Sequence, residues 1–259
     1  MLGAIAGDII GSPFEGWGLQ IKTAEFDLFT ERSRFTDDTV LTVAVAKAIL
    51  SGMDYTSTFK LYGRRYPRAG YGGAFHKWIH SANSAPYNSW GNGSAMRVSP
   101  VGWAFDTVED VLLEAERTAE VTHNHPEGIK GAEATALAVF LARTGESKEE
   151  IRSQIAGRFS YDLNRTLADI RPTYTFDVSC QGSVPESIIA FLESDGFECA
   201  VRNAISLGGD SDTMACIAGA ITEAFYGGVP AEIASAVRTR LPDELVEVID
   251  EFRDRFHTP

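Results

Sequence analysis

The sequence has little positive charge, few cysteines and no long apolar run. Its 259 residues carry 23 Lys and Arg against 36 Asp and Glu, a formal net charge of -13. This balance argues against the phosphate backbone of a nucleic acid as the main partner. The three cysteines, Cys180, Cys199 and Cys216, form no CxxC pair, so no disulfide framework or zinc ribbon is indicated. We expect them to be reduced and buried in a cytoplasmic protein.

The amino-terminal segment MLGAIAGDIIGSPFE is apolar but has no basic leader, and Asp8 interrupts a run too short to span a bilayer. We therefore expect no signal peptide and no membrane anchor, and we expect Asp8 to be a buried hydrogen-bonding residue. Gly3, Gly7 and Gly11 recur every four residues, which places three bare backbone patches on one face of a helix. This helix is expected to pack very closely against a neighbour in the same chain.

Helical periodicity dominates the rest of the chain. The stretch 37–50 is apolar almost all round, which predicts a central helix, and 108–121 has an apolar stripe opposite its charges. Further helices are expected at 127–142, 187–193, 198–206, 213–226 and 244–256. Extended patterns are confined to the neighbourhood of 174–176, and the longest irregular region is expected at 158–185. Because the chain has no repeat and no linker, it predicts one all-α domain over residues 1–259.

Two short acidic segments stand out, FTDDT at 35–39 and GGDSDT at 208–213, each at the start of an expected apolar helix. In one interpretation they cap these helices, because Asp, Ser and Thr satisfy free backbone N–H groups and complement the helix dipole. In the other they bind metal. A cap needs one side chain, whereas each segment supplies two carboxylates, and burying four unpaired carboxylates is prohibitively costly. Two divalent cations would balance four Asp in charge.

The candidate ligands are hard oxygens with no cysteine or obvious histidine cluster, which favours Mg²⁺ or Mn²⁺ over Zn²⁺. The spacing lacks the alternating acidic residues and distal Glu of an EF-hand loop. A phosphatase-type DxDx(T/V) motif would follow a hydrophobic strand, but Asp210 follows a Gly-Gly turn and Thr213 comes one position early. The segments therefore indicate an oxygen-ligand metal site of another kind.

The glycine-rich stretch 91–96 (GNGSAM) offers small residues and accessible backbone N–H groups, which suit a diphosphate. It fails the dinucleotide fingerprint GxGxxG because its sixth position is Met96, and a plain tight loop is the alternative interpretation. Tyr87 and Trp90, just before it, either cover an adenine or ribose face or belong to the core. Arg97 is either a phosphate contact or a structural residue, and we favour the structural role.

Five motifs together resemble the ADP-ribosylglycohydrolase family and follow its order. They are GAIAGDIIGSPFE at 3–15, FTDDTVLTVAVA at 35–46, GNGSAMRVSPVG at 91–102, THNHPEGIKGAEA at 122–134 and SLGGDSDTMACIAGAITEAFYG at 206–227. The resemblance implies a compact orthogonal multi-helix bundle. It implies a two-metal site at Thr36, Asp37, Asp38, Asp210, Asp212 and Thr213, with Glu15 near the scissile bond. It implies ADP-ribose binding by Gly91, Asn92, Gly93, Ser94, Met96 and His123.

The implied activity is hydrolysis of the bond between ADP-ribose and a protein side chain, with arginine as the expected acceptor and Mg²⁺ or Mn²⁺ as cofactors. Glu15, Asp38 and Asp212 are the candidate catalytic residues, with Asp212 or Asp38 as the base. Alternatives are serine-linked ADP-ribose, O-acetyl-ADP-ribose, an ADP-ribosylated nucleic-acid end, a silent ADP-ribose binder, and a phosphohydrolase acting on the diphosphate. The partners expected are an ADP-ribosylated protein and ADP-ribose, with a monomeric enzyme and no membrane.

Overall fold

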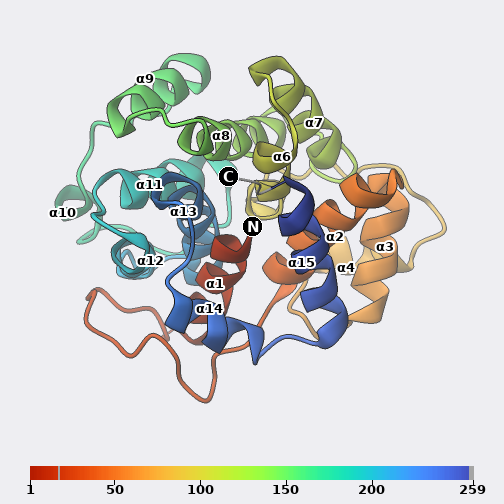
Figure 1. Ribbon diagram of the computed structural model, residues 1–259, viewed down its shortest axis with the longest axis horizontal. Helices are drawn as coiled ribbons and strands as arrows, with labels where there is room; N and C mark the ends of the chain where they lie inside the picture. Colours follow the sequence, from red (N-terminus) through yellow and green to blue (C-terminus); the bar gives the residue numbers. More distant parts are fainter. Residues whose placement is uncertain (17, 257–259) are drawn as a thin grey trace.

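The computed structural model describes residues 1–16 and 18–256, and this part of the chain is built from α-helices (Figure 1). Their bounds are α1 Leu2–Gly11, α2 Asp37–Ser51, α3 Tyr55–Arg65, α4 Gly73–His80, α5 Gly93–Met96, α6 Ser99–Ala104, α7 Val108–Glu120, α8 Pro126–Arg143, α9 Lys148–Phe159, α10 Leu167–Ile170, α11 Cys180–Leu192, α12 Phe197–Ile205, α13 Ser211–Tyr226, α14 Ala231–Arg238 and α15 Asp243–Phe256. A 3-10 turn, η1, covers Ser12–Phe14. Pairing of the β type is limited, in the described residues, to one antiparallel bridge between Gly91 and Ser179. The all-α prediction is confirmed, and the prediction of a single domain stays a prediction.

The helix α1 packs on α13 through bare backbone. A Cβ on Gly7 would lie 2.0 Å from the Ala215 carbonyl oxygen, and a Cβ on Gly3 would lie 2.3 Å from that of Gly219. The expected close-packing face of the first helix is therefore confirmed. Figure 1 shows α1 beside α13 in the middle of the molecule, where both are surrounded by other helices.

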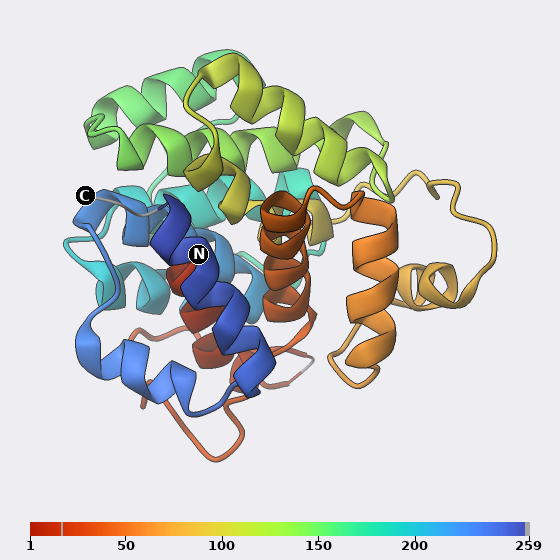
Figure 2. The ribbon, with the colours of Figure 1, turned by 45° about the vertical axis from the view of Figure 1, so that its right-hand side comes forward.

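The other long helices enclose this pair. In Figure 1, α8 lies across the top of the view, above α13 and α11. Figure 2 shows α2 and α3 standing side by side, with α15 crossing diagonally nearby. Apolar side chains from these helices join one hydrophobic cluster that includes Ile5, Val43, Leu137, Ile217 and Phe252, each fully buried or nearly so.

The prediction of the longest irregular region was wrong. Within 158–185, α9 continues to Phe159, α10 forms at Leu167–Ile170 and α11 begins at Cys180. Pro185 lies inside α11, in its second turn. Because proline has no backbone N–H, the helix lacks one hydrogen bond to its first turn there. The longest stretch without an α-helix among the described residues instead follows α1 and η1, between Phe14 and Asp37. Figure 1 shows it looping around the lower edge of the molecule.

In the described part of the chain, no helix combines the length and the apolar character that crossing a membrane requires.

The contact between α1 and α13 yields a test with a matched control. We expect Gly7→Ala to lower the free energy of unfolding by about 1–3 kcal/mol or more, because the new methyl group would overlap the Ala215 backbone. Gly157→Ala in α9, where a Cβ meets nothing within 4 Å, is expected to stabilise by about 0.5–1 kcal/mol. Urea unfolding measures both, and equal effects of the two substitutions would contradict the close contact.

Candidate metal and ligand site

Asp8 ties the first helix to the start of α2. Its side chain is fully buried and accepts hydrogen bonds from the Thr36 amide (2.9 Å), the Thr36 hydroxyl (2.7 Å) and the Thr39 amide (3.1 Å). The Thr39 hydroxyl also donates to it. The expected role of Asp8 as a buried hydrogen-bonding residue is confirmed, and the result is that the start of α2 is held at a fixed place beside α1.

Two carboxylates follow directly. Asp37 is half-buried and Asp38 is 2% exposed. One oxygen of Asp38, Oδ2, lies 3.4 Å from the Thr36 hydroxyl and 3.4 Å from the Thr213 hydroxyl. The other, Oδ1, is buried and has no hydrogen-bond partner in the described part of the chain. Asp38 therefore spans from α2 toward α13 with one oxygen unsatisfied.

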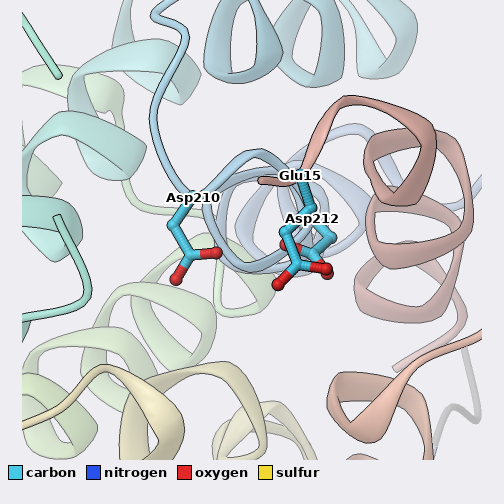
Figure 3. A group of neighbouring side chains, drawn as sticks. All are labelled: Glu15, Asp210 and Asp212. Atoms are coloured by element: carbon cyan, nitrogen blue, oxygen red, sulfur yellow. The ribbon is translucent and has the colours of Figure 1, made fainter. Parts of the chain in front are cut away.

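The start of α13 supplies the second pair of carboxylates, and Glu15 joins them. One ligand atom from each of Glu15, Asp210 and Asp212 lies within 4.8 Å of the others. Figure 3 shows the three carboxyl groups pointing to the same side, with Glu15 and Asp212 next to each other. The Thr213 amide donates to one oxygen of Asp212 (3.0 Å), and the Asn92 side-chain amide donates to Asp210 (2.8 Å). These bonds orient both carboxyl groups.

Helix capping does not account for these carboxylates. At α2 the cap is the Thr36 side chain, which accepts from the Asp38 amide. At α13 Asp210 occupies the capping position but its side chain makes no capping bond. Of the two interpretations of the acidic segments, capping therefore describes Thr36, and the purpose of the Asp side chains lies elsewhere.

Burial and mutual repulsion favour the protonated form of these carboxyl groups. Burial raises the pKa of Asp37 to about 8, and the neighbouring Asp8 adds to this. Burial, followed by the charges of other site carboxylates, raises the pKa of Asp38 and of Asp212 well above the usual value. Burial also raises the pKa of Asp210 to about 6, against the hydrogen bond from Asn92. No Lys or Arg is among the causes of these shifts, so no nearby cation in the described part of the chain lowers these pKa values.

The donor set fits divalent cations. Among the described residues, none of Asp37, Asp38, Asp210 and Asp212 forms an ion pair with a Lys or Arg side chain. All the groups offered are carboxylate and hydroxyl oxygens, the type that Mg²⁺ and Mn²⁺ prefer. The unpartnered Asp38 Oδ1 is the kind of buried atom that a ligand or ion normally satisfies.

The carboxylates form one wall of a cavity of about 320 Å³, which falls at the lower end of the range for small-molecule sites. The predicted site residues that line it are Glu15, Asp37, Asp38, Gly91, Asn92, Gly93, Met96, His123, Asp210, Asp212 and Thr213. Two predicted residues lie outside this lining. Thr36 is held by Asp8 beneath Asp38, and the fully buried Ser94 donates its hydroxyl proton to the Gly128 carbonyl oxygen at 2.6 Å.

The glycine-rich loop is fixed by contacts on both sides. The Asn92 amide donates to the Val178 carbonyl oxygen (2.8 Å), and the Cys180 amide donates to the Trp90 carbonyl oxygen (3.0 Å). His123 lies behind the loop, since a Cβ on Gly93 would be 3.1 Å from its Nε2. Of the two preceding aromatic residues, Tyr87 lines the cavity, and Trp90, which is 48% exposed, does not.

Several cavity residues had no signal in a local motif. Phe75, Phe176 and Val178 line the cavity, together with the glycine-rich turn before α4 (Gly70, Gly72, Gly73). A Cβ on Gly70 would lie 3.3 Å from Oδ1 of Asp37. The sequence GYGG at 70–73 was a visible turn signal that the sequence analysis did not use. The apolar residues come from segments that meet the site only in three dimensions.

Comparison with known proteins agrees with this geometry. A family model described as ADP-ribosylglycohydrolase matches residues 1–259. ADP-ribosylhydrolase ARH3 from Gallus gallus is 28% identical over 310 residues, covering 88% of this chain and 84% of that protein, and ARH3 from Homo sapiens is 28% identical over 305 residues with the same coverage. ADP-ribosylarginine hydrolase Tri1 from Pseudomonas putida (strain GB-1) is 26% identical over 150 residues, covering 55% of this chain and 40% of that protein.

A solved structure named "ADP-ribosylglycohydrolase-related protein complex" superposes with a TM-score of 0.71. It is 26% identical and covers 95% of this chain and 94% of its own. The similarity therefore extends over most of the fold.

The raised pKa values predict how stability depends on pH when metal is removed. A carboxyl group whose pKa is raised by folding stabilises the folded state most below its unfolded pKa, about 4, and loses this contribution as the pH rises through its folded value. With folded pKa values of about 6 for Asp210 and about 8 for Asp37, we expect the EDTA-treated protein to lose stability between about pH 4 and pH 8. Asp37→Asn should make this loss shallower. Thermal unfolding across this range is the measurement, and a flat profile in the wild type would contradict it.

Proposed function

The chain belongs to the ADP-ribosylglycohydrolase family, and we propose that it uses two divalent cations, Mg²⁺ or Mn²⁺, to release ADP-ribose from a modified protein side chain. The observation that carries this proposal is the convergence of Glu15, Asp37, Asp38, Asp210 and Asp212 on one cavity that also contains the loop 91–93. Carboxylates at this density, with cations bound to them, next to small residues suited to a diphosphate, match a ligand that carries both phosphate and ribose.

In the proposal Thr36, Asp37, Asp38, Asp210, Asp212 and Thr213 hold the cations. Their oxygen donors and the absence of ion pairs from Lys or Arg among the described residues support this assignment. When bound, the cations supply positive charge that orients ribose hydroxyl groups and lowers the pKa of a bound water.

The chain's own carboxylates serve the proton transfer. Hydrolysis of a glycosidic bond passes through an oxocarbenium-like state, which nearby negative charge stabilises. We propose Asp212 as the base that takes the proton of the attacking water, because the Thr213 amide fixes its orientation. Asp38 is the alternative base. Glu15, which lies beside Asp212 (Figure 3), orients the water or the leaving group.

The glycine-rich loop binds the rest of the ligand. We propose that the backbone N–H of Gly93 receives the diphosphate, with Gly91, Asn92, Ser94, Met96 and His123 around it, because the N–H groups of Gly91 and Asn92 already donate to Ser89 and Val178. Asn92 is well placed to keep the loop in register, because its side chain lies 3.2 Å from the Ser183 hydroxyl and 2.8 Å from Asp210. Tyr87 and Phe176 on the cavity wall offer apolar faces for the adenine or a ribose.

Arginine is the acceptor that we propose, and the similarity to Tri1, an ADP-ribosylarginine hydrolase, supports it. The ARH3 relatives match more of the chain, and their names specify no acceptor. Serine-linked ADP-ribose, O-acetyl-ADP-ribose and ADP-ribosylated nucleic acid are therefore the competing substrates for the same chemistry.

Product analysis tests the reaction. Arginine-linked and serine-linked ADP-ribosyl peptides are incubated with the protein and Mg²⁺ or Mn²⁺, and the products are identified by mass spectrometry. We expect free ADP-ribose and an unmodified arginine peptide, with no product after EDTA treatment. Cleavage of the serine peptide alone would show that the acceptor is serine and not arginine. Release of AMP, with ribose left on the peptide, would indicate a phosphohydrolase. No cleavage of either peptide, together with ADP-ribose binding, would indicate a silent binder.

A pair of substitutions tests the assignment of the base. Asp212→Asn is expected to lower kcat by about 10²–10⁴-fold, the usual contribution of a general base. It should also raise the melting temperature of the metal-free protein, because it removes one buried carboxylate from the cluster. Asp254→Asn, at an exposed position in α15, serves as the control and should leave turnover unchanged. Near-normal turnover of the Asp212 variant would move the role to Asp38.

A further inference from the structure

Arg97 is a buried cation that has no carboxylate partner among the described residues. It is fully buried, and its guanidinium carbon lies 4.5 Å from the centre of the Phe59 ring. Its Nη2 donates to the Thr118 carbonyl oxygen (2.8 Å) and to the Thr122 hydroxyl (3.0 Å), while Nε and Nη1 have no partner among the described residues. Burying an unpaired cation is costly, and an apolar side chain would fill this space at lower cost. The guanidinium therefore has a purpose beyond filling the core.

Arg97 itself is among the residues that line the cavity, and one of its hydrogen-bond partners links it to His123. The Thr122 hydroxyl oxygen lies 2.8 Å from Nδ1 of His123. A guanidinium only donates hydrogen bonds, so the Thr122 oxygen is the acceptor toward Arg97, and its single proton remains for Nδ1. The Tyr87 hydroxyl also interacts with Thr122, and the second lone pair of the oxygen can accept from it. With Nδ1 as an acceptor, a neutral His123 carries its proton on Nε2.

The Nε2 side of the ring faces the glycine-rich loop. A Cβ on Gly93 would lie 3.1 Å from Nε2 and a Cβ on Gly91 3.8 Å from it, and His123 lines the cavity. The groups that face this imidazole are Arg97 and Tyr87, whose ring centre is 6.0 Å away. Burial, and then the charge of Arg97, lower the pKa of His123 well below its usual value, which favours the neutral ring.

We propose that Arg97 is a positioning residue that acts through Thr122 to hold His123 as the Nε2-protonated tautomer, so that a permanent N–H donor faces an oxygen atom of the ligand beside loop 91–93. The proposal rests on the proposed function only for the identity of that ligand, ADP-ribose. Arg97 thus has two roles. Its hydrogen bond to Thr118, near the carboxyl end of α7, stabilises that helix end, and its hydrogen bond to Thr122 orients His123.

The tautomer is measurable without any substrate. Two-dimensional NMR of the whole protein labelled with ¹⁵N-histidine distinguishes protonated from unprotonated ring nitrogens, and His123→Asn identifies the His123 signals. We expect the wild type to show a proton on Nε2 and none on Nδ1, unchanged between pH 6 and pH 8. A proton on Nδ1 would overturn the proposal, as would a ring that becomes charged in this pH range.

Two substitutions at Thr122 separate orientation from helix stabilisation. Thr122→Val removes the hydroxyl but leaves the bond from Arg97 to Thr118, so we expect a mixture of tautomers and about tenfold weaker binding of ADP-ribose by calorimetry. Thr122→Ser keeps the hydroxyl and should keep the wild-type tautomer and affinity. A wild-type tautomer in Thr122→Val would overturn the proposal.

A double substitution asks whether Arg97 acts through Thr122. If it does, Arg97→Met combined with Thr122→Val should weaken ADP-ribose binding no more than Thr122→Val alone, because the two changes break the same chain of bonds. Additive losses would overturn the proposal. If the protein binds ADP-ribose with the expected tautomer but releases none from peptides, the proposed function fails while the role of Arg97 stands.

Discussion

The carboxylate of Asp8 is the point on which the arrangement of the site depends. It fixes the amino-terminal end of α2 through Thr36 and Thr39, while its own helix lies against the backbone of α13. The carboxylates of α2 and α13 are therefore placed by a third helix between them. Glu15 follows the same helix through the turn η1, so a single rigid element sets the relative positions of all the acidic groups.

The site opposes the stability of the protein that contains it. Several carboxylates whose pKa is raised by burial and an arginine without an ion-pair partner among the described residues are each less favourable than an apolar residue. Such conflicts between local rules and the global fold are typical of functional sites. The tight contact of α1 with α13 and the large apolar cluster offset them. The well-packed core thus holds together carboxylates whose mutual repulsion would otherwise drive them apart.

The features that the sequence predicted correctly have local signals. Gly3, Gly7 and Gly11 predicted the close helix contact because spacing alone places them on one face, and the FTDDT and GGDSDT segments predicted buried carboxylates at helix starts. The role of Glu15 came from the family resemblance. The apolar part of the cavity lining could not be predicted, because Phe75 and Phe176 reach the cavity only through tertiary packing. The region 158–185 misled because Pro172, Gly182 and Pro185 suggest a loop, whereas Gly182 and Pro185 lie within α11.

The pairing of α1 with α13 also sets an order of events during synthesis. Gly3 is 220 residues from the Glu223 side chain that accepts its amide proton, and Thr213 is 175 residues from Asp38. At roughly 5–20 residues per second, the first helix leaves the ribosome about ten to forty seconds before its partner exists. An isolated ten-residue helix is only marginally stable in water, so the nascent chain carries an exposed apolar segment during that interval. The acidic site is consequently among the last features to form, and the apolar first helix stays exposed to aggregation until it does.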